Sequence, residues 1–135
     1  MNNLMKEYTK QYDDPIKLFL EMSMNQIDFF KGLSPEIKTE WIYNMQLRQL
    51  EKGAMVYQLD TFSDEMYVIQ SGQVNILQYI DSESLKEHFI IEKLFRGSVI
   101  NHNSFLMKDG IDTDAICFTS VSMFFIHIDT INRMR

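Results

Sequence analysis

The side chains most suited to catalysis or metal binding are few in this sequence and stand far apart. The 3 histidines are His88, His102 and His127, and the 1 cysteine is Cys117. A metal site on a β-sheet needs several histidines and carboxylates on neighbouring strands, and no His-x-His pair occurs. Ser104 follows His102 closely, but closeness in sequence is poor evidence for a nucleophile–base pair. We therefore expect exposed or half-exposed histidines, with His127 facing outward, and a buried, inert Cys117 thiol.

Known enzyme motifs are also missing from the sequence. It has no Gly-x-Ser-x-Gly turn, no Gly-x-x-x-x-Gly-Lys loop and no Gly-x-Gly-x-x-Gly run, and it contains only 5 glycines. These motifs expose a nucleophile or let backbone amides approach a phosphate, so their absence removes the corresponding chemistry. The sequence predicts a protein that is not an enzyme and that carries no resident cofactor or metal.

Charge and composition narrow the class of partner. The chain has 13 basic and 19 acidic residues, a net charge of −6. Nucleic acid is therefore not expected as a partner, because phosphate binding needs a positive field. A single cysteine rules out an internal disulfide and favours an intracellular setting. The polar N-terminus and the absence of an apolar run of about 20 residues predict no signal peptide and no direct membrane insertion.

The first third of the chain has helical periodicity. Asp14 and Pro15 fit the N-cap and first position of a helix, and apolar residues then recur at three- and four-residue steps until Gly32. Ser34 is placed to cap a second helix. Residues 1–32 are therefore predicted to form an N-terminal helical segment of linker-like character.

From about residue 47 the periodicity changes to the alternation of β-strands. Short strands at this turn-punctuated spacing are typical of a sandwich or a jelly roll. Strands are expected over residues 55–59, 66–69, 73–80, 88–94, 115–119 and 123–128, and residues 98–107 are expected to form a strand end plus one helical turn. Asp129 is expected to cap a final helix. The predicted fold class is mainly β with flanking α-helices, a double-stranded β-helix (jelly roll) preceded by two helices, with a domain over 33–135 that is truncated in its C-terminal helix.

The stretch from Phe29 to Ile128 resembles the cyclic-nucleotide-binding domain family. Its strongest segment runs from Asp64 to Val74 and is similar to the family's Asp-x-x-Tyr-x-Ile-x-x-Gly-x-Val run. Weaker similarities cover Phe29–Pro35, Lys52–Gln58 and Leu94–Ser98, which resemble the start of the family's first helix, its first barrel strands and the approach to its phosphate-binding cassette. The resemblance implies a β-jelly roll in which cyclic nucleotide binds inside the barrel. A C-terminal helix then closes over the ligand and moves an attached effector.

The resemblance also assigns a pocket, and the pocket departs from the family pattern. The positions equivalent to the cyclic-nucleotide pocket are Asn101, His102, Asn103, Ser104, Thr113 and Asp114. In the family a glutamate receives the ribose hydroxyl and an arginine pairs with the phosphate, and these positions fall on His102 and Thr113. A charge-assisted hydrogen bond of that kind contributes about 1.5–3 kcal/mol, which a threonine does not supply.

Acidic residues surround the phosphate position as well. Asp109, Asp112 and Asp114 lie around it, with Lys108 as the opposing cation. An anion would meet a negative loop, so we expect cAMP or cGMP to bind weakly or not at all. The alternative is that Arg96 or Lys108 reaches the phosphate.

The altered cassette suggests a particular kind of protein. The stretch from Gly97 to Leu106 resembles the cyclic-nucleotide-binding homology domains of ether-à-go-go-type potassium channels. This resemblance implies a regulatory module on the cytoplasmic side of a cation (potassium) channel. Its partner would be the rest of its own polypeptide, with a homotetramer in the full-length protein.

Two other hypotheses stay open at this stage. One is a genuine cAMP or cGMP sensor domain of a channel or of a protein kinase regulatory subunit, in which backbone amides after Gly97 attract the phosphate. The other is a metal-dependent jelly-roll enzyme, which stoichiometric bound iron or zinc would support.

Overall fold

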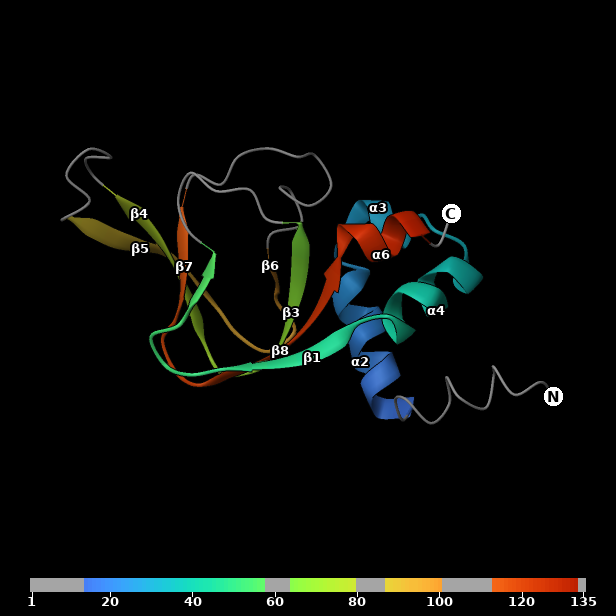
Figure 1. The fold of residues 1–135 in the computed structure, drawn as a ribbon, viewed down its shortest axis with the longest axis horizontal. Coiled ribbons are helices and arrows are strands. Elements are labelled where there is room, and N and C mark those ends of the chain that lie inside the picture. Colours follow the sequence, from blue (N-terminus) through green and yellow to red (C-terminus); the bar gives the residue numbers. More distant parts are fainter. Residues whose placement is uncertain (1–13, 58–63, 80–86, 101–112, 134–135) are drawn as a thin grey trace.

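Two β-sheets and a group of helices make up the described part of the chain. The computed structural model describes residues 14–57, 64–79, 87–100 and 113–133. Within these ranges the strands form two four-stranded sheets, and the helices gather together at one side of the strand region (Figure 1). The fold is mainly β with helices preceding the sheets, as predicted.

Every described strand pairing is antiparallel. The first sheet has the order β1 (Gln46–Leu50), β8 (Val121–His127), β3 (Glu65–Ser71) and β6 (Val99–Ile100). The second sheet has the order β2 (Met55–Tyr57), β7 (Asp114–Cys117), β4 (Val74–Tyr79) and β5 (His88–Leu94). Each predicted strand corresponds to an observed one. The bounds 88–94 agree, the predicted ends at 59 and 80 lie outside the described residues, and the other ends differ by at most two residues. For the short strand β1, the sequence predicted only a change from helical to alternating periodicity and no strand with defined ends.

The first predicted helix is in fact two helices. The structure has α2 (Asp14–Met24) and α3 (Asp28–Lys31) in its place. Beyond Met24 the backbone turns, with the N–H of Gln26 bonded to the carbonyl of Ser23 instead of continuing the helical ladder. The Gln26 side chain also donates to the carbonyl oxygen of Gly97 at 2.8 Å, which ties this turn to the strand region. Tertiary context of this kind often overrides local helical periodicity.

The second helix begins as predicted, whereas the last one does not. In α4 (Pro35–Tyr43), the Ser34 hydroxyl accepts a hydrogen bond from the N–H of Ile37 at 3.4 Å. The last helix, α6 (Ile128–Arg133), starts one residue before the expected cap, Asp129. The His127 ring accepts the N–H of Asp129 at 3.0 Å instead, so the histidine satisfies a free donor in the first turn.

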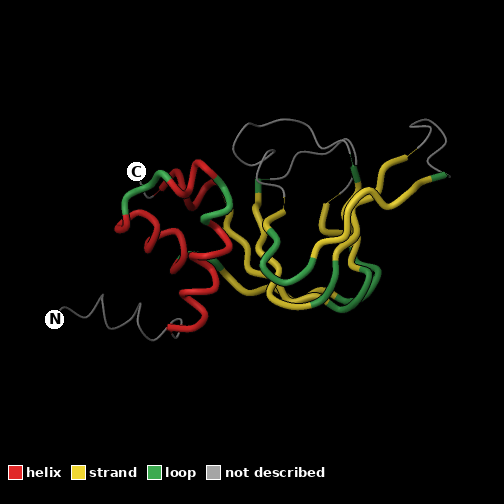
Figure 2. The backbone as a smooth tube through the Cα atoms, turned by 180° about the vertical axis from the view of Figure 1, so that it is seen from behind, coloured by secondary structure: helices red, strands yellow, loops and turns green. Residues whose placement is uncertain are grey.

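Two hydrophobic cores lie on the two faces of the first sheet. One core packs α2, α3, α4 and α6 against the outer face of β3 and β8 and contains Leu20, Met24, Ile27, Phe30, Trp41, Ile42, Met45, Met66, Val68, Phe124, Ile126 and Ile131. The other fills the space between the sheets and contains Tyr67, Ile69, Val74, Ile76, Ile100, Ala115, Cys117, Val121 and Met123. Figure 2 shows the helices packed together at the side of the strand region. Alternate residues of β3 and β8 therefore serve different cores.

Candidate functional site

The candidate site is the end of the barrel at which several described strands begin or end. At this edge β2 ends at Tyr57, β3 begins at Glu65 and β7 begins at Asp114. The pairing of Tyr67 with Ile100 brings the end of β6 to the same edge (Figure 1). The predicted pocket residues Asn101, His102, Asn103 and Ser104 lie outside the described residues, so their roles stay predictions.

Thr113 faces the interior of the barrel at this edge. It precedes Ala115 by two residues, and Ala115 belongs to the core between the sheets. The Thr113 hydroxyl is hydrogen-bonded to the hydroxyl of Tyr57 at 3.4 Å, and Tyr57 is the cross-strand partner of Ala115. Thr113 is only 8% exposed. The position to which the resemblance assigns the phosphate-binding arginine therefore holds a buried, neutral hydroxyl.

Asp114 directly follows Thr113 and is the first residue of β7. It pairs with Leu77 on β4, and its carboxylate accepts a hydrogen bond from the hydroxyl of Tyr79, two residues beyond Leu77. Asp114 precedes Ala115 by one residue within β7, so its side chain lies on the opposite face of the strand from Ala115 and the interior core. The hydrogen bond to Asp114 raises the pKa of Tyr79, because the carboxylate favours the protonated phenol. The two predicted pocket residues thus have different partners, Tyr57 for Thr113 and Tyr79 for Asp114.

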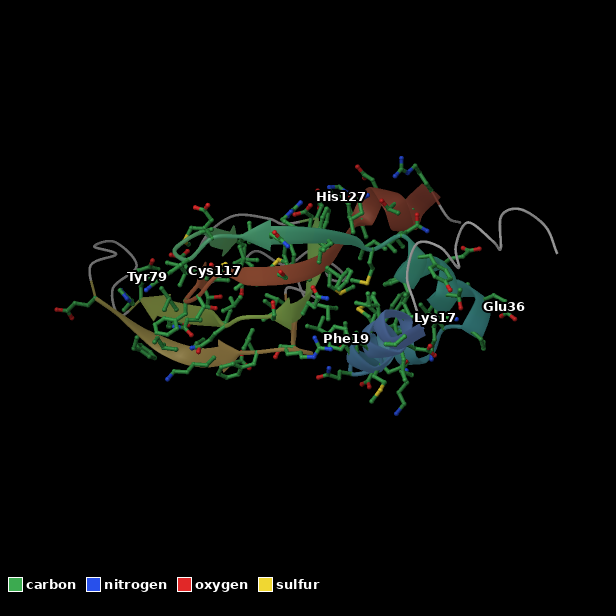
Figure 3. All side chains as sticks on the ribbon, turned by 90° about the horizontal axis from the view of Figure 1, so that it is seen from below. Lys17, Phe19, Glu36, Tyr79, Cys117 and His127 are labelled. Carbon is green, nitrogen blue, oxygen red and sulfur yellow. The ribbon has the colours of Figure 1, made fainter. Side chains whose placement is uncertain are left out.

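Arg96 does not line the barrel interior. Its guanidinium lies over the ring of Phe19, with Cζ 4.1 Å from the ring centroid, and donates to the carbonyl oxygen of Gln70 at 2.8 Å. Figure 3 shows Phe19 on the side of α2 that faces the strands. Arg96 therefore joins the helices to the sheets, and in this arrangement its guanidinium is engaged by Phe19 and Gln70. The alternative in which Arg96 reaches a phosphate stays a prediction. Lys108, the other cation of that alternative, lies outside the described residues.

Sequence reasoning missed a polar group on the interior wall. Arg48 of β1 donates from both terminal nitrogens to the two carboxylate oxygens of Glu65 on β3, each at 2.9 Å. The Tyr67 hydroxyl also donates to Glu65, at 3.0 Å. The hydrogen bonds from Arg48 lower the pKa of Glu65, and the carboxylate raises the pKa of Arg48. The sequence did contain a signal for the position of Arg48. Arg48 and Leu50 are two residues apart, which places both side chains on one face of the strand.

The remaining predicted residues behave as structural groups. Cys117 is a free thiol that is 1% exposed, and burial raises its pKa, which makes it a poor nucleophile. His88 is exposed, as expected. His127 was expected to face outward, but it is the cross-strand partner of Glu65 and so lies on the interior face of its sheet, at the open edge, where its side chain is 39% exposed. Among the described residues, no group of three potential ligands is arranged to hold a metal ion. None of the helices in the described ranges has the length and apolar character needed to cross a membrane.

Comparison with known proteins identifies the family of the chain. The sequence profile described as "Cyclic nucleotide-binding domain" matches residues 47–135, well over half of the chain. The chain belongs to this family. Its members are regulatory domains, so the chain is a cyclic-nucleotide-binding-like regulatory domain with the jelly-roll fold. A search of curated proteins finds no match.

Solved structures with the same fold include protein kinase regulatory subunits. The chain is similar to cAMP-bound PfPKA-R, with a TM-score of 0.79, 16% identity, and coverage of 90% of this chain and 42% of that one. It is similar to the regulatory domain of Toxoplasma gondii PKA with cAMP, with a TM-score of 0.76, 20% identity, and coverage of 90% of this chain and 45% of that one. It is also similar to the regulatory subunit of a cAMP-independent protein kinase A from Trypanosoma cruzi bound to guanosine. For this pair the TM-score is 0.71, the identity is 15%, and the coverage is 98% of this chain and 44% of that one. The chain spans less than half of each of these proteins.

Proposed function

We propose that this domain is a regulatory module of a larger protein and that its barrel binds cAMP and cGMP weakly or not at all. The observation that carries the proposal is Thr113, a buried hydroxyl hydrogen-bonded to Tyr57 where a phosphate-binding cation is expected. The cation found on the described interior wall, Arg48, is already paired with Glu65. A phosphate entering the barrel would have to compete with a carboxylate that is covalently part of the wall.

The similar structures indicate that the ligand of such a domain is inferred from the side chains of its site and not from its fold. PfPKA-R and the Toxoplasma gondii domain hold cAMP, whereas the Trypanosoma cruzi subunit is cAMP-independent and holds guanosine. All three have the fold of this chain at 20% identity or less. The same barrel therefore accommodates charged and uncharged ligands, and the side chains that line it decide between them.

The proposed effector is a cation (potassium) channel, with the domain on the cytoplasmic side and four copies in the assembly. The resemblance of Gly97–Leu106 to channel homology domains supports this assignment. The helices support a mechanical role, because Phe30, Trp41 and Ile131 share one core with β3 and β8. The sequence of the whole gene tests the assignment. Six apolar spans upstream of this domain would support a channel, and a kinase-type partner sequence would contradict it.

Calorimetry tests the ligand proposal directly. The domain is titrated with cAMP, cGMP and their uncharged nucleosides, adenosine and guanosine. If no cation grips the phosphate, each cyclic nucleotide should bind no more tightly than its nucleoside, and we expect no heat from cAMP or cGMP up to millimolar concentration. Micromolar cAMP or cGMP binding that exceeds nucleoside binding a hundredfold would overturn the proposal and support the sensor.

A further inference from the structure

A guanidinium–carboxylate pair spans three strands on the interior wall of the barrel. The order of the first sheet is β1–β8–β3, so Arg48 on β1 must cross the middle strand to reach Glu65 on β3. It crosses over Phe125, with Cζ 3.8 Å from the ring centroid. Both of its terminal nitrogens then bond to Glu65 at 2.9 Å. The aromatic ring and the two parallel hydrogen bonds hold the guanidinium in one orientation.

The pair faces the space between the sheets and not the helices. Leu50 and Phe125 pack against the interior core, and Arg48 shares the strand face of Leu50. Tyr67 belongs to that same core and bonds to Glu65. Both partners are accessible as well as interior, since their side chains are 35% and 23% exposed. The guanidinium therefore lies on the wall that a ligand in the barrel would meet.

The geometry of the pair is that of a bound anion. A guanidinium presents a planar fork of donors that fits a carboxylate or a phosphate equally well. Here the carboxylate of Glu65 occupies that fork, and it receives a third hydrogen bond from Tyr67. Glu65 thus occupies the donors that a phosphate would need, and it adds a negative charge beside them.

We propose that Arg48 is a latent anion-binding group inside the barrel and that Glu65 is its built-in counter-ion, which excludes phosphorylated ligands. This inference rests on the proposed function, in which the unaltered domain binds cyclic nucleotides weakly or not at all. It adds a specificity-determining residue, Glu65, on a strand that precedes the cassette along the chain. Removal of the negative charge at Glu65 should convert the wall into a site for a phosphate ester.

The test is a gain of binding in Glu65→Gln. Glutamine keeps the shape of the side chain and an oxygen that accepts from Arg48 and Tyr67, so only the charge is lost. By calorimetry, cAMP should bind at least about tenfold more tightly to Glu65→Gln than to the unaltered domain, as expected for one new charge-assisted hydrogen bond. Adenosine, which has no phosphate, should bind both proteins equally. The matched control is Arg48→Met/Glu65→Gln, which keeps an apolar stem over Phe125 and should lose the gain.

The outcomes separate this inference from the proposed function. Tight, phosphate-dependent cAMP binding by the unaltered domain contradicts the proposed function. An unaltered domain that does not bind, together with a folded Glu65→Gln that binds cAMP no better, overturns the role of Glu65. A gain that persists in the double variant overturns the role of Arg48. Thermal melting checks folding, and Glu65→Thr, which suits a strand, carries the same test if Glu65→Gln does not fold.

Discussion

Gly72 lies where the chain passes from the first sheet to the second, and its replacement tests the fold strictly. The residue has φ +93°, and a Cβ placed there would lie 2.3 Å from the carbonyl oxygen of Ser120 and 2.9 Å from the Thr119 hydroxyl. Gly53 has almost the same backbone conformation, φ +89°, but a Cβ there would meet nothing within 4 Å. The two glycines differ in the space around them and not in backbone strain, so they form a matched pair.

The expected magnitudes follow from this difference. An alanine in the left-handed region costs roughly 1–2 kcal/mol, and that cost applies at both positions. At Gly72 the clash is with backbone just before β8, which cannot move without disturbing the central strand of its sheet. Overpacking of this kind adds about 1–3 kcal/mol. We therefore expect Gly72→Ala to lower the free energy of unfolding by about 2–5 kcal/mol and Gly53→Ala by about 1–2 kcal/mol.

Urea denaturation followed by circular dichroism measures both values, with the slope of the transition checked for two-state behaviour. Equal losses of stability in the two variants would refute the reasoning, because they would show that the connection between the sheets does not pass as close to Ser120 as the structure has it. A Gly53→Ala loss larger than the Gly72→Ala loss would refute it more strongly.

Two further predictions concern the helical core and the interior ion pair. Phe30→Ala should lower the free energy of unfolding by about 3–5 kcal/mol, because this fully buried ring packs with its centroid 5.7 Å from that of Trp41. Phe29→Ala, at a side chain that is 50% exposed, should lower it by less than about 1 kcal/mol. Urea midpoints that fall equally in both variants would contradict the assignment of the core. The pKa of Glu65 is lowered in the folded state, so its ionised form adds stability above its unfolded pKa of about 4.3, and this is lost as the pH falls through the lower folded value. The stability advantage of the unaltered domain over Glu65→Gln should therefore shrink between pH 7 and pH 3, and an advantage independent of pH would contradict the ion pair.

Strand positions were predictable where local chemistry decides them. The strand His88–Leu94 was predicted with the bounds that the structure shows, because turn residues precede it and a glycine follows it. The cap at Ser34 was predictable for the same reason, since a hydroxyl before a proline satisfies a free helix donor wherever the helix packs. Structural features that a few neighbouring residues determine can therefore be predicted from the sequence.

Features set by tertiary contacts were not predictable. The break after Met24 coincides with a bond from Gln26 to Gly97, and these residues are 71 positions apart. The pairing of Arg48 with Glu65 depends on the strand order β1–β8–β3, which the period of the sequence does not contain. The pocket was assigned by resemblance, and its positions 101–104 lie outside the described residues. Thr113 and Asp114, which the same resemblance assigned to the pocket, are hydrogen-bonded to different side chains, Tyr57 and Tyr79.

The proposed function needs a path from the barrel to the helices, and the two faces of the first sheet form one. On β3 and β8 the residues that face the barrel interior are Tyr67, Ile69, Val121 and Met123, and those that face the helices are Met66, Val68, Phe124 and Ile126. Close-packed side chains do not absorb a displacement, so a shift of the interior wall must move the outer face of the same strands. The outer face carries Trp41 of α4 and Ile131 of α6. Any occupant that changes the spacing of the barrel wall, whether a neutral ligand or a segment of the chain, therefore acts on the helices through two shared strands.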